Sequence, residues 1–72
     1  MSKIMKIGII GLGLIGGSIA LKLKEVNNKI IIYGFDQNTE SLDYSLKNNI
    51  IDKRFNPDSF KGFDYIFLAM PV

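Results

Sequence analysis

The sequence predicts an α/β fold built on a parallel β-sheet, and three observations support this prediction. Strand-like and helix-like hydrophobic patterns alternate along the 72 residues, a glycine-rich turn separates the first strand from the first helix, and an acidic residue directly follows the second strand. Parallel neighbours in a sheet require crossover connections, so alternating strands and helices are typical of parallel sheets with right-handed crossovers. We expect the strand order 3-2-1-4.

The first strand and the first helix differ in the period of their apolar residues. Residues 4–10 are rich in β-branched side chains and almost continuously apolar, as is typical of a central strand covered on both faces. The apolar residues after the glycine-rich turn recur at near-helical spacing: Ile15, Ile19, Leu23 and Val26. We therefore expect a helix over residues 15–26 that stops at Asn27 and Asn28.

A second strand and a second helix follow. Residues 29–35 form another buried run, and Asp36 stands directly at its carboxyl end. Asn38 is suited to cap the N-terminus of a helix, because its side chain accepts hydrogen bonds from the first amides. The pattern predicts a helix over residues 39–48, with Asn49 in the left-handed position that often ends a helix.

Two more strands are expected, over residues 50–55 and 65–69, the last one ending before Pro71, which has no amide to donate. In the order 3-2-1-4 the link between them spans about 22 Å. Nine residues, 56–64, reach about 30 Å when extended but only about 14 Å as a helix. We expect an extended link with at most one helical turn near residues 59–61.

Aromatic residues in or beside the strands are expected to pack in the core, with Phe60 or Phe63 covering the sheet face that the link crosses. These residues are Tyr33, Phe35, Phe60, Phe63, Tyr65 and Phe67.

The glycine-rich turn has the sequence Gly-Leu-Gly-Leu-Ile-Gly, which matches the pattern G-x-G-x-x-G. Gly11 permits the bend out of the strand, Gly13 leaves room for a pyrophosphate, and Gly16 allows the helix to pack against the sheet. The amides of Leu14 and Ile15 at the helix N-terminus favour a bound anion without a basic side chain. Such turns also serve close packing alone. The flanking strand and helix, and an acid twenty residues past the last glycine, favour dinucleotide binding in a Rossmann-type fold.

Asp36 completes the predicted dinucleotide site. A carboxylate at the end of the second strand accepts hydrogen bonds from ribose hydroxyls and repels a 2′-phosphate. An NADP site usually has Arg or Lys just beyond this strand, whereas Gln37, Asn38 and Thr39 follow here. The sequence therefore favours NAD as the cofactor. The alternative is that Asp36 only initiates a turn.

The amino-acid composition limits the chemistry that this chain can perform. Without Cys or His, the chain offers no disulfide, no thiolate metal site and no imidazole base, so we expect neither catalytic nor metal-binding residues in it. Nine basic and seven acidic residues are scattered, which argues against nucleic acid as a partner. The uncharged run over residues 7–21 has 15 residues and five glycines, too short and too glycine-rich for a membrane span. We expect a cytoplasmic protein.

The longer string from Gly11 to Ser18 resembles the opening of prephenate and arogenate dehydrogenases. Further segments resemble the same family in the same order: residues 33–36, Asn38, residues 40–42, residues 49–52 and residues 68–72.

This resemblance implies hydride transfer from prephenate to NAD with loss of carbon dioxide, giving 4-hydroxyphenylpyruvate in tyrosine biosynthesis. It implies that the glycine-rich turn holds the pyrophosphate, that Asp36 binds the adenine ribose, and that Met70 and Pro71 line the cofactor. In that family the catalytic His and the substrate-binding Arg residues lie further along, in the rest of the nucleotide domain and in a helical dimerisation domain. Residues 1–72 are thus expected to be the truncated N-terminal part of a dinucleotide-binding domain from a homodimeric dehydrogenase.

Two alternatives remain open. Dehydrogenases of the β-hydroxyacid or 6-phosphogluconate type share the Gly-Leu-Gly turn, but generally continue with Met-Gly. A nucleotide-sensing module without catalytic residues would also need only a short Rossmann unit.

Overall fold

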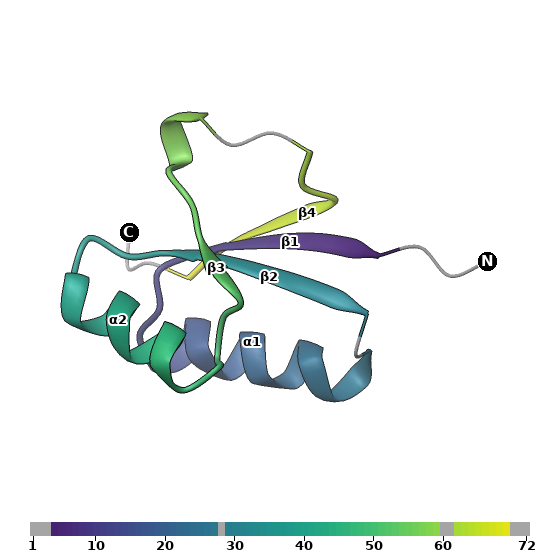
Figure 1. The fold of residues 1–72 in the computed structure, drawn as a ribbon, viewed down its shortest axis with the longest axis horizontal. Coiled ribbons are helices and arrows are strands. Elements are labelled where there is room, and N and C mark those ends of the chain that lie inside the picture. The colour runs from purple at the N-terminus through teal and green to yellow at the C-terminus, as the bar shows by residue number, and fades with distance from the viewer. Residues whose placement is uncertain (1–3, 28, 60–61, 70–72) are drawn as a thin grey trace.

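The computed structural model describes residues 4–27, 29–59 and 62–69 (Figure 1). The strands of the described sheet are β1 (Met5–Ile10), β2 (Ile30–Phe35), β3 (Lys53–Arg54) and β4 (Tyr65–Leu68). The helices are α1 (Leu14–Val26), α2 (Thr39–Lys47) and a short 3-10 helix, η1 (Pro57–Ser59). None of the helices in these ranges is long and apolar enough to cross a membrane.

The strands form one parallel sheet in the order β3-β2-β1-β4, which confirms the predicted α/β, Rossmann-type fold. Helices α1 and α2 cover one face of this sheet, and the link from β3 to β4 passes over the other face (Figure 1). Within its described residues, 56–59 and 62–64, the link contains one helical turn, η1, slightly earlier than expected. A short extended link is therefore sufficient for this topology, as the distances predicted.

The main core lies between the sheet and the two helices. Side chains of β1 and β2 that point to the helices are almost fully buried, because alternate residues of a strand face the same side. The buried apolar residues are Ile7, Ile9, Leu12, Ala20, Ile30, Ile32, Leu42 and Ile51. Leu12 belongs to this core, so the glycine-rich turn is anchored by a buried side chain.

An aromatic cluster covers the opposite face. The ring of Phe63 contacts those of Tyr33 and Phe55 edge to face, with centroids 5.1 and 4.9 Å apart. Gly8 of β1 lies beneath this cluster, where a Cβ atom would be in ordinary van der Waals contact, 3.4 Å from Phe55 and 3.5 Å from Phe63. Phe63 thus covers the sheet as predicted, whereas Phe60 lies outside the described residues.

The third strand is shorter than predicted, because residues 50–52 are used differently. The amides of Ile50 and Ile51 donate to the carbonyl oxygen of Ser45 at 2.8 and 3.2 Å and so close the end of α2. Asp52 then extends the sheet in part with its side chain. Its amide donates to the oxygen of Ile32 at 2.8 Å, while its Oδ2 accepts the amide of Ile32 at 2.9 Å. Regular pairing begins only at Lys53.

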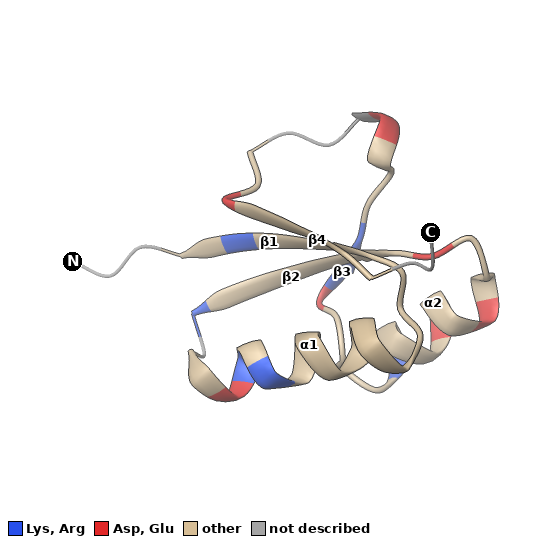
Figure 2. Cartoon of the chain, turned by 180° about the vertical axis from the view of Figure 1, so that it is seen from behind, with Lys and Arg blue, Asp and Glu red and all other residues tan. Residues whose placement is uncertain are grey.

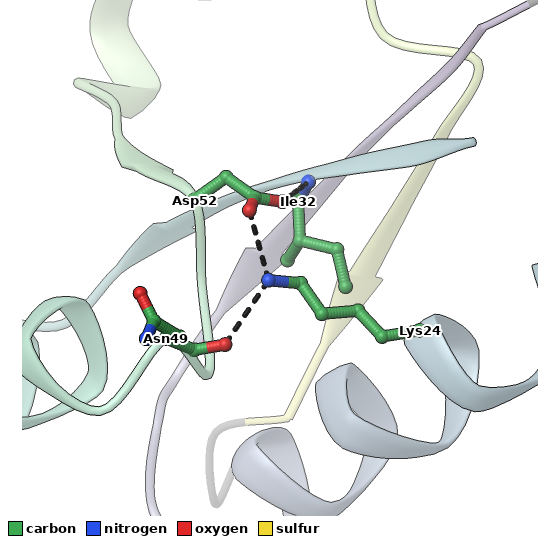
Figure 3. A network of polar contacts seen from close by, with 4 residues as sticks. All are labelled: Lys24, Ile32, Asn49 and Asp52. Carbon is green, nitrogen blue, oxygen red and sulfur yellow. Dashed lines mark hydrogen bonds and ion pairs between the residues drawn. The ribbon is translucent and has the colours of Figure 1, made fainter. Parts of the chain in front are cut away.

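A lysine from α1 joins Asp52 to the end of α2 (Figure 3). Lys24 Nζ lies 2.8 Å from Asp52 Oδ1 and donates to the carbonyl oxygen of Asn49 at 3.0 Å. Asn49 has φ of 58°, so it adopts the predicted left-handed conformation. This network connects α1, the end of α2 and β2.

Strand β4 departs from the expectation of core packing for all strand aromatics. Tyr65 is 58% exposed and Phe67 is 37% exposed, although their register partners Ile7 and Ile9 are fully buried. The physical reason is position, since β4 is the edge strand of the described sheet and α1 packs on β1 and β2.

Candidate nucleotide-binding site

The glycine-rich turn leaves the carboxyl end of β1 and enters α1. Gly11 has φ of 98°, in the left-handed region that strains other residues. Its amide donates to the carbonyl oxygen of Phe35 at 2.8 Å, so the bend remains attached to the neighbouring strand β2. The turn therefore begins at the edge of the sheet where β1 and β2 both end.

Gly16 and Gly13 have different surroundings. A Cβ atom at Gly16 would overlap the carbonyl oxygen of Gly11, so α1 packs backbone to backbone against the turn. At Gly13 no atom of the described residues lies within 4 Å of the Cβ position, and its φ of −70° is open to any residue. Packing explains the glycine at position 16, whereas the space at Gly13 is free for a ligand.

The N-termini of the two helices are also unlike each other. Gly13 is the N-cap of α1, which has neither a side-chain cap nor an acidic residue in its first turn. In α2, Asn38 Oδ1 accepts the amides of Glu40 and Ser41 at 2.9 and 3.2 Å. The first amides of an α-helix have no partner within the helix and attract anions. The predicted amides of Leu14 and Ile15 begin α1, where no side chain competes for them.

Asp36 lies beside this turn. Its Oδ2 accepts the amide of Leu12 at 2.7 Å and its Oδ1 accepts the amide of Asn38 at 2.8 Å. The structure thus brings the predicted ribose-binding carboxylate and the glycine-rich turn together. Each carboxylate oxygen has a second lone pair, so both can still accept a hydrogen bond from a ribose hydroxyl.

Charges are distributed unevenly around the site (Figure 2). The first half of α1 carries none, carboxylates lie at the N-terminal end of α2, and β3 is basic. The residues directly after β2 include no cation, as the sequence indicated. However, Arg54 of β3 is the register partner of Gly34, near the end of β2. It lines a hollow of about 430 Å³ together with Phe35, Leu42, Phe55 and Asn56.

Sequence reasoning missed two of these features. The amide of Leu12 as a partner of Asp36, and Arg54 beside the end of β2, both depend on pairings between distant segments. Neither leaves a local signal in the sequence. Met70 and Pro71, the other two predicted cofactor contacts, lie outside the described residues.

A family model described as "NADP oxidoreductase coenzyme F420-dependent" matches residues 6–72. The chain belongs to this family. The match covers the glycine-rich turn and Asp36, together with all four strands except the first residue of β1.

Membership in the NADP oxidoreductase family makes the chain a Rossmann-type segment of an NAD(P)-dependent oxidoreductase, with a nicotinamide dinucleotide as cofactor. Within the described ranges no group of three or more His, Cys, Asp or Glu side chains lies close enough to hold a metal ion.

Proposed function

We propose that residues 1–72 are the N-terminal, NAD-binding part of a larger dinucleotide-binding domain in a prephenate-dehydrogenase-like oxidoreductase. The observation that carries NAD binding is the placement of the Asp36 carboxylate beside the glycine-rich turn, 2.7 Å from the amide of Leu12. The resemblance of the strings around Gly11–Ser18 and residues 33–36 to prephenate and arogenate dehydrogenases supports the choice of substrate.

Each binding residue has a defined task in this proposal. The amides of Leu14 and Ile15 bind the pyrophosphate, for which the open space at Gly13 provides room. Gly11 and Gly16 shape the turn, and Asp36 binds the hydroxyls of the adenine ribose. Further along, Met70 and Pro71 line the cofactor. A bound nicotinamide dinucleotide supplies the hydride acceptor, while these residues bind and orient it.

The preference for NAD over NADP is an electrostatic argument. A 2′-phosphate in place of the hydroxyl would bring two like charges together, which at about 4 Å is unfavourable by about 1 kcal/mol in water and about 4 kcal/mol near a protein surface. A ribose hydroxyl would instead donate to Asp36. We expect the protein to bind NAD about ten-fold or more tightly than NADP.

A second candidate is an enzyme that uses NADP with coenzyme F420, as the description of the family says. Arg54 favours this candidate, because it comes from β3 to the end of β2, and a guanidinium binds phosphate by paired hydrogen bonds. The two candidates differ in the residue that contacts the adenine ribose. In the first, Asp36 binds its hydroxyls, and in the second, Arg54 binds its 2′-phosphate.

The substrate and the catalytic residues belong to other parts of the protein in this proposal. The chain has no His, and Arg54 is its single Arg. The exposed side chains of β4 support a continuing domain, because Tyr65 and Leu68 are 58% and 75% exposed on a strand with apolar residues on both faces. We propose that further strands and helices cover β4, and that a helical domain supplies the catalytic His and forms a homodimer.

Titration calorimetry with NAD and NADP tests the cofactor choice. The wild type is expected to prefer NAD, Asp36→Ser to narrow that preference, and Arg54→Ala to leave NAD binding unchanged. Tighter binding of NADP that disappears in Arg54→Ala would instead support the NADP cofactor of the second candidate. Oxidation of prephenate by the full-length protein, followed as NADH absorbance, tests the substrate.

A further inference from the structure

Asp36 has backbone contacts that a ribose-binding residue does not need. We infer that Asp36 is also a positioning residue for the pyrophosphate site, because its carboxylate holds the glycine-rich turn in place. This inference rests on the proposed dinucleotide binding and adds a second role to one of its residues. Loss of Asp36 would then weaken the binding even of a dinucleotide whose adenine ribose has no hydroxyls.

The geometry of the carboxylate supports this role. Its two oxygens accept amides from two separate segments, Leu12 in the turn after β1 and Asn38 in the turn after β2, at 2.7 and 2.8 Å. Leu12 precedes Asp36 by 24 residues. The carboxylate thus joins the two turns that flank the proposed cofactor.

The hydrogen bond from the amide of Leu12 to Asp36 fixes the backbone of the glycine-rich turn at its most flexible point. Leu12 lies between Gly11, which has φ of 98°, and Gly13, so the backbone on either side of it is intrinsically free to rotate. Its side chain is 6% exposed and packs in the core. An amide at this position without Asp36 would lose its partner at a part-buried site, which is unfavourable unless the backbone shifts.

A second hydrogen bond, from the adjacent residue Gly11, also holds the glycine-rich turn to the end of β2. The amide of Gly11 donates to the carbonyl oxygen of Phe35, the last residue of β2, and the amide of Leu12 donates to the side chain of Asp36, the residue after it. Without Asp36 only the first of these bonds remains before α1 begins at Leu14. The amides of Leu14 and Ile15 would then lose the orientation that suits a pyrophosphate.

Simple electrostatics predicts the opposite effect. Removing a carboxylate near the proposed pyrophosphate relieves repulsion between like charges and should strengthen binding. A ligand without hydroxyls on its adenine ribose separates the two effects, because its affinity no longer includes the hydrogen bonds from ribose to Asp36.

The experiment compares NAD with its 2′,3′-dideoxyadenosine analogue in calorimetric titrations of the purified protein. Asp36→Ala is expected to weaken binding of the analogue by about ten-fold, the typical effect of a lost hydrogen bond to a charged group. Asp36→Asn, which keeps one acceptor oxygen, should recover part of this loss. Asp43→Ala is the matched control, since it removes an exposed carboxylate from α2 and should change nothing.

The outcomes are distinct. Equal or tighter binding of the analogue by Asp36→Ala overturns the positioning role, even if NAD itself binds more weakly. Failure of the wild type to bind either ligand refutes the proposed function instead. Circular dichroism establishes that each variant is folded. If Asp36→Ala is not, Asp36→Asn decides the question: weaker binding of the analogue than by wild type supports the inference, and equal binding overturns it.

Discussion

The carbonyl oxygen of Gly11 occupies the space that a side chain at Gly16 would need. The turn and the first turn of α1 are therefore in direct backbone contact. At Gly13 and Gly17 the corresponding space contains no atom of the described residues within 4 Å. The glycines of this segment thus fall into two groups, one required by packing and one not, and substitutions distinguish them.

Gly16→Ala is expected to lower the free energy of unfolding by about 3 kcal/mol, because the added methyl group forces backbone atoms apart. Gly17→Ala is the control within the same helix. It should raise stability by up to about 1 kcal/mol through the better helix propensity of Ala. Urea unfolding monitored by circular dichroism measures both, and a Gly16→Ala variant as stable as wild type would contradict the packing.

Gly13→Val should abolish NAD binding while the protein stays folded. The backbone of Gly13 is open to a β-branched residue, and the space is free, but the side chain would occupy the proposed position of the pyrophosphate. A calorimetric titration and a thermal melt measure the two properties separately. Unfolding together with loss of binding would show that position 13 serves packing alone.

Asp52→Ala is expected to be more destabilising than Lys24→Met. The first change removes a charged partner from the amide of Ile32 and costs about 2 kcal/mol. The second removes an ion pair whose side chains are 27% and 37% exposed, so solvent screening limits its effect to about 1 kcal/mol or less. Equal losses in denaturant unfolding would mean that the ion pair, and not the backbone contact, holds β3.

Phe63→Ala should lower the free energy of unfolding by about 2 kcal/mol. This value is below the usual 3 to 5 kcal/mol for a buried Phe, because the ring is only half-buried. Phe63→Leu, which keeps much of the apolar volume, should lose about half as much. If both variants unfold at the same urea concentration as wild type, the link from β3 to β4 does not stabilise the sheet.

Residues 1–72 alone are expected to show no dehydrogenase activity with prephenate and NAD at any pH. They contain no His, and Arg54 is their single guanidinium. The measurement is NADH formation against a blank without protein, with full-length protein as the positive control. Any turnover above the blank would show that the chain contains its own catalytic groups.

Much of the fold was predictable because its signals are local. The periods of apolar residues identified both helices and the central strands to within one residue, and Asn38 and Asn49 took the cap positions expected of them. The third strand was predicted too long, since a run of apolar residues does not reveal that the Asp52 side chain replaces regular pairing.

For the candidate site, the sequence indicated which residue types belong together but not which atoms meet. The glycine pattern and Asp36 were identified from spacing. The hydrogen bond between Asp36 and Leu12, and the approach of Arg54 to β2, arise only once β1, β2 and β3 are side by side. Such contacts depend on the register in which the strands pair, and a single sequence does not reveal that register.

The exposed edge strand β4 also governs how the chain behaves in concentrated solution. Its residues Tyr65–Leu68 combine high β-propensity with no charge and no proline, and its outer edge has no partner strand among the described residues. Asp64, whose carboxylate accepts the amide of Lys6, is the charge that immediately precedes it. A chain with this edge uncovered is prone to intermolecular strand pairing and aggregation, and its colloidal stability depends on what shields those four residues.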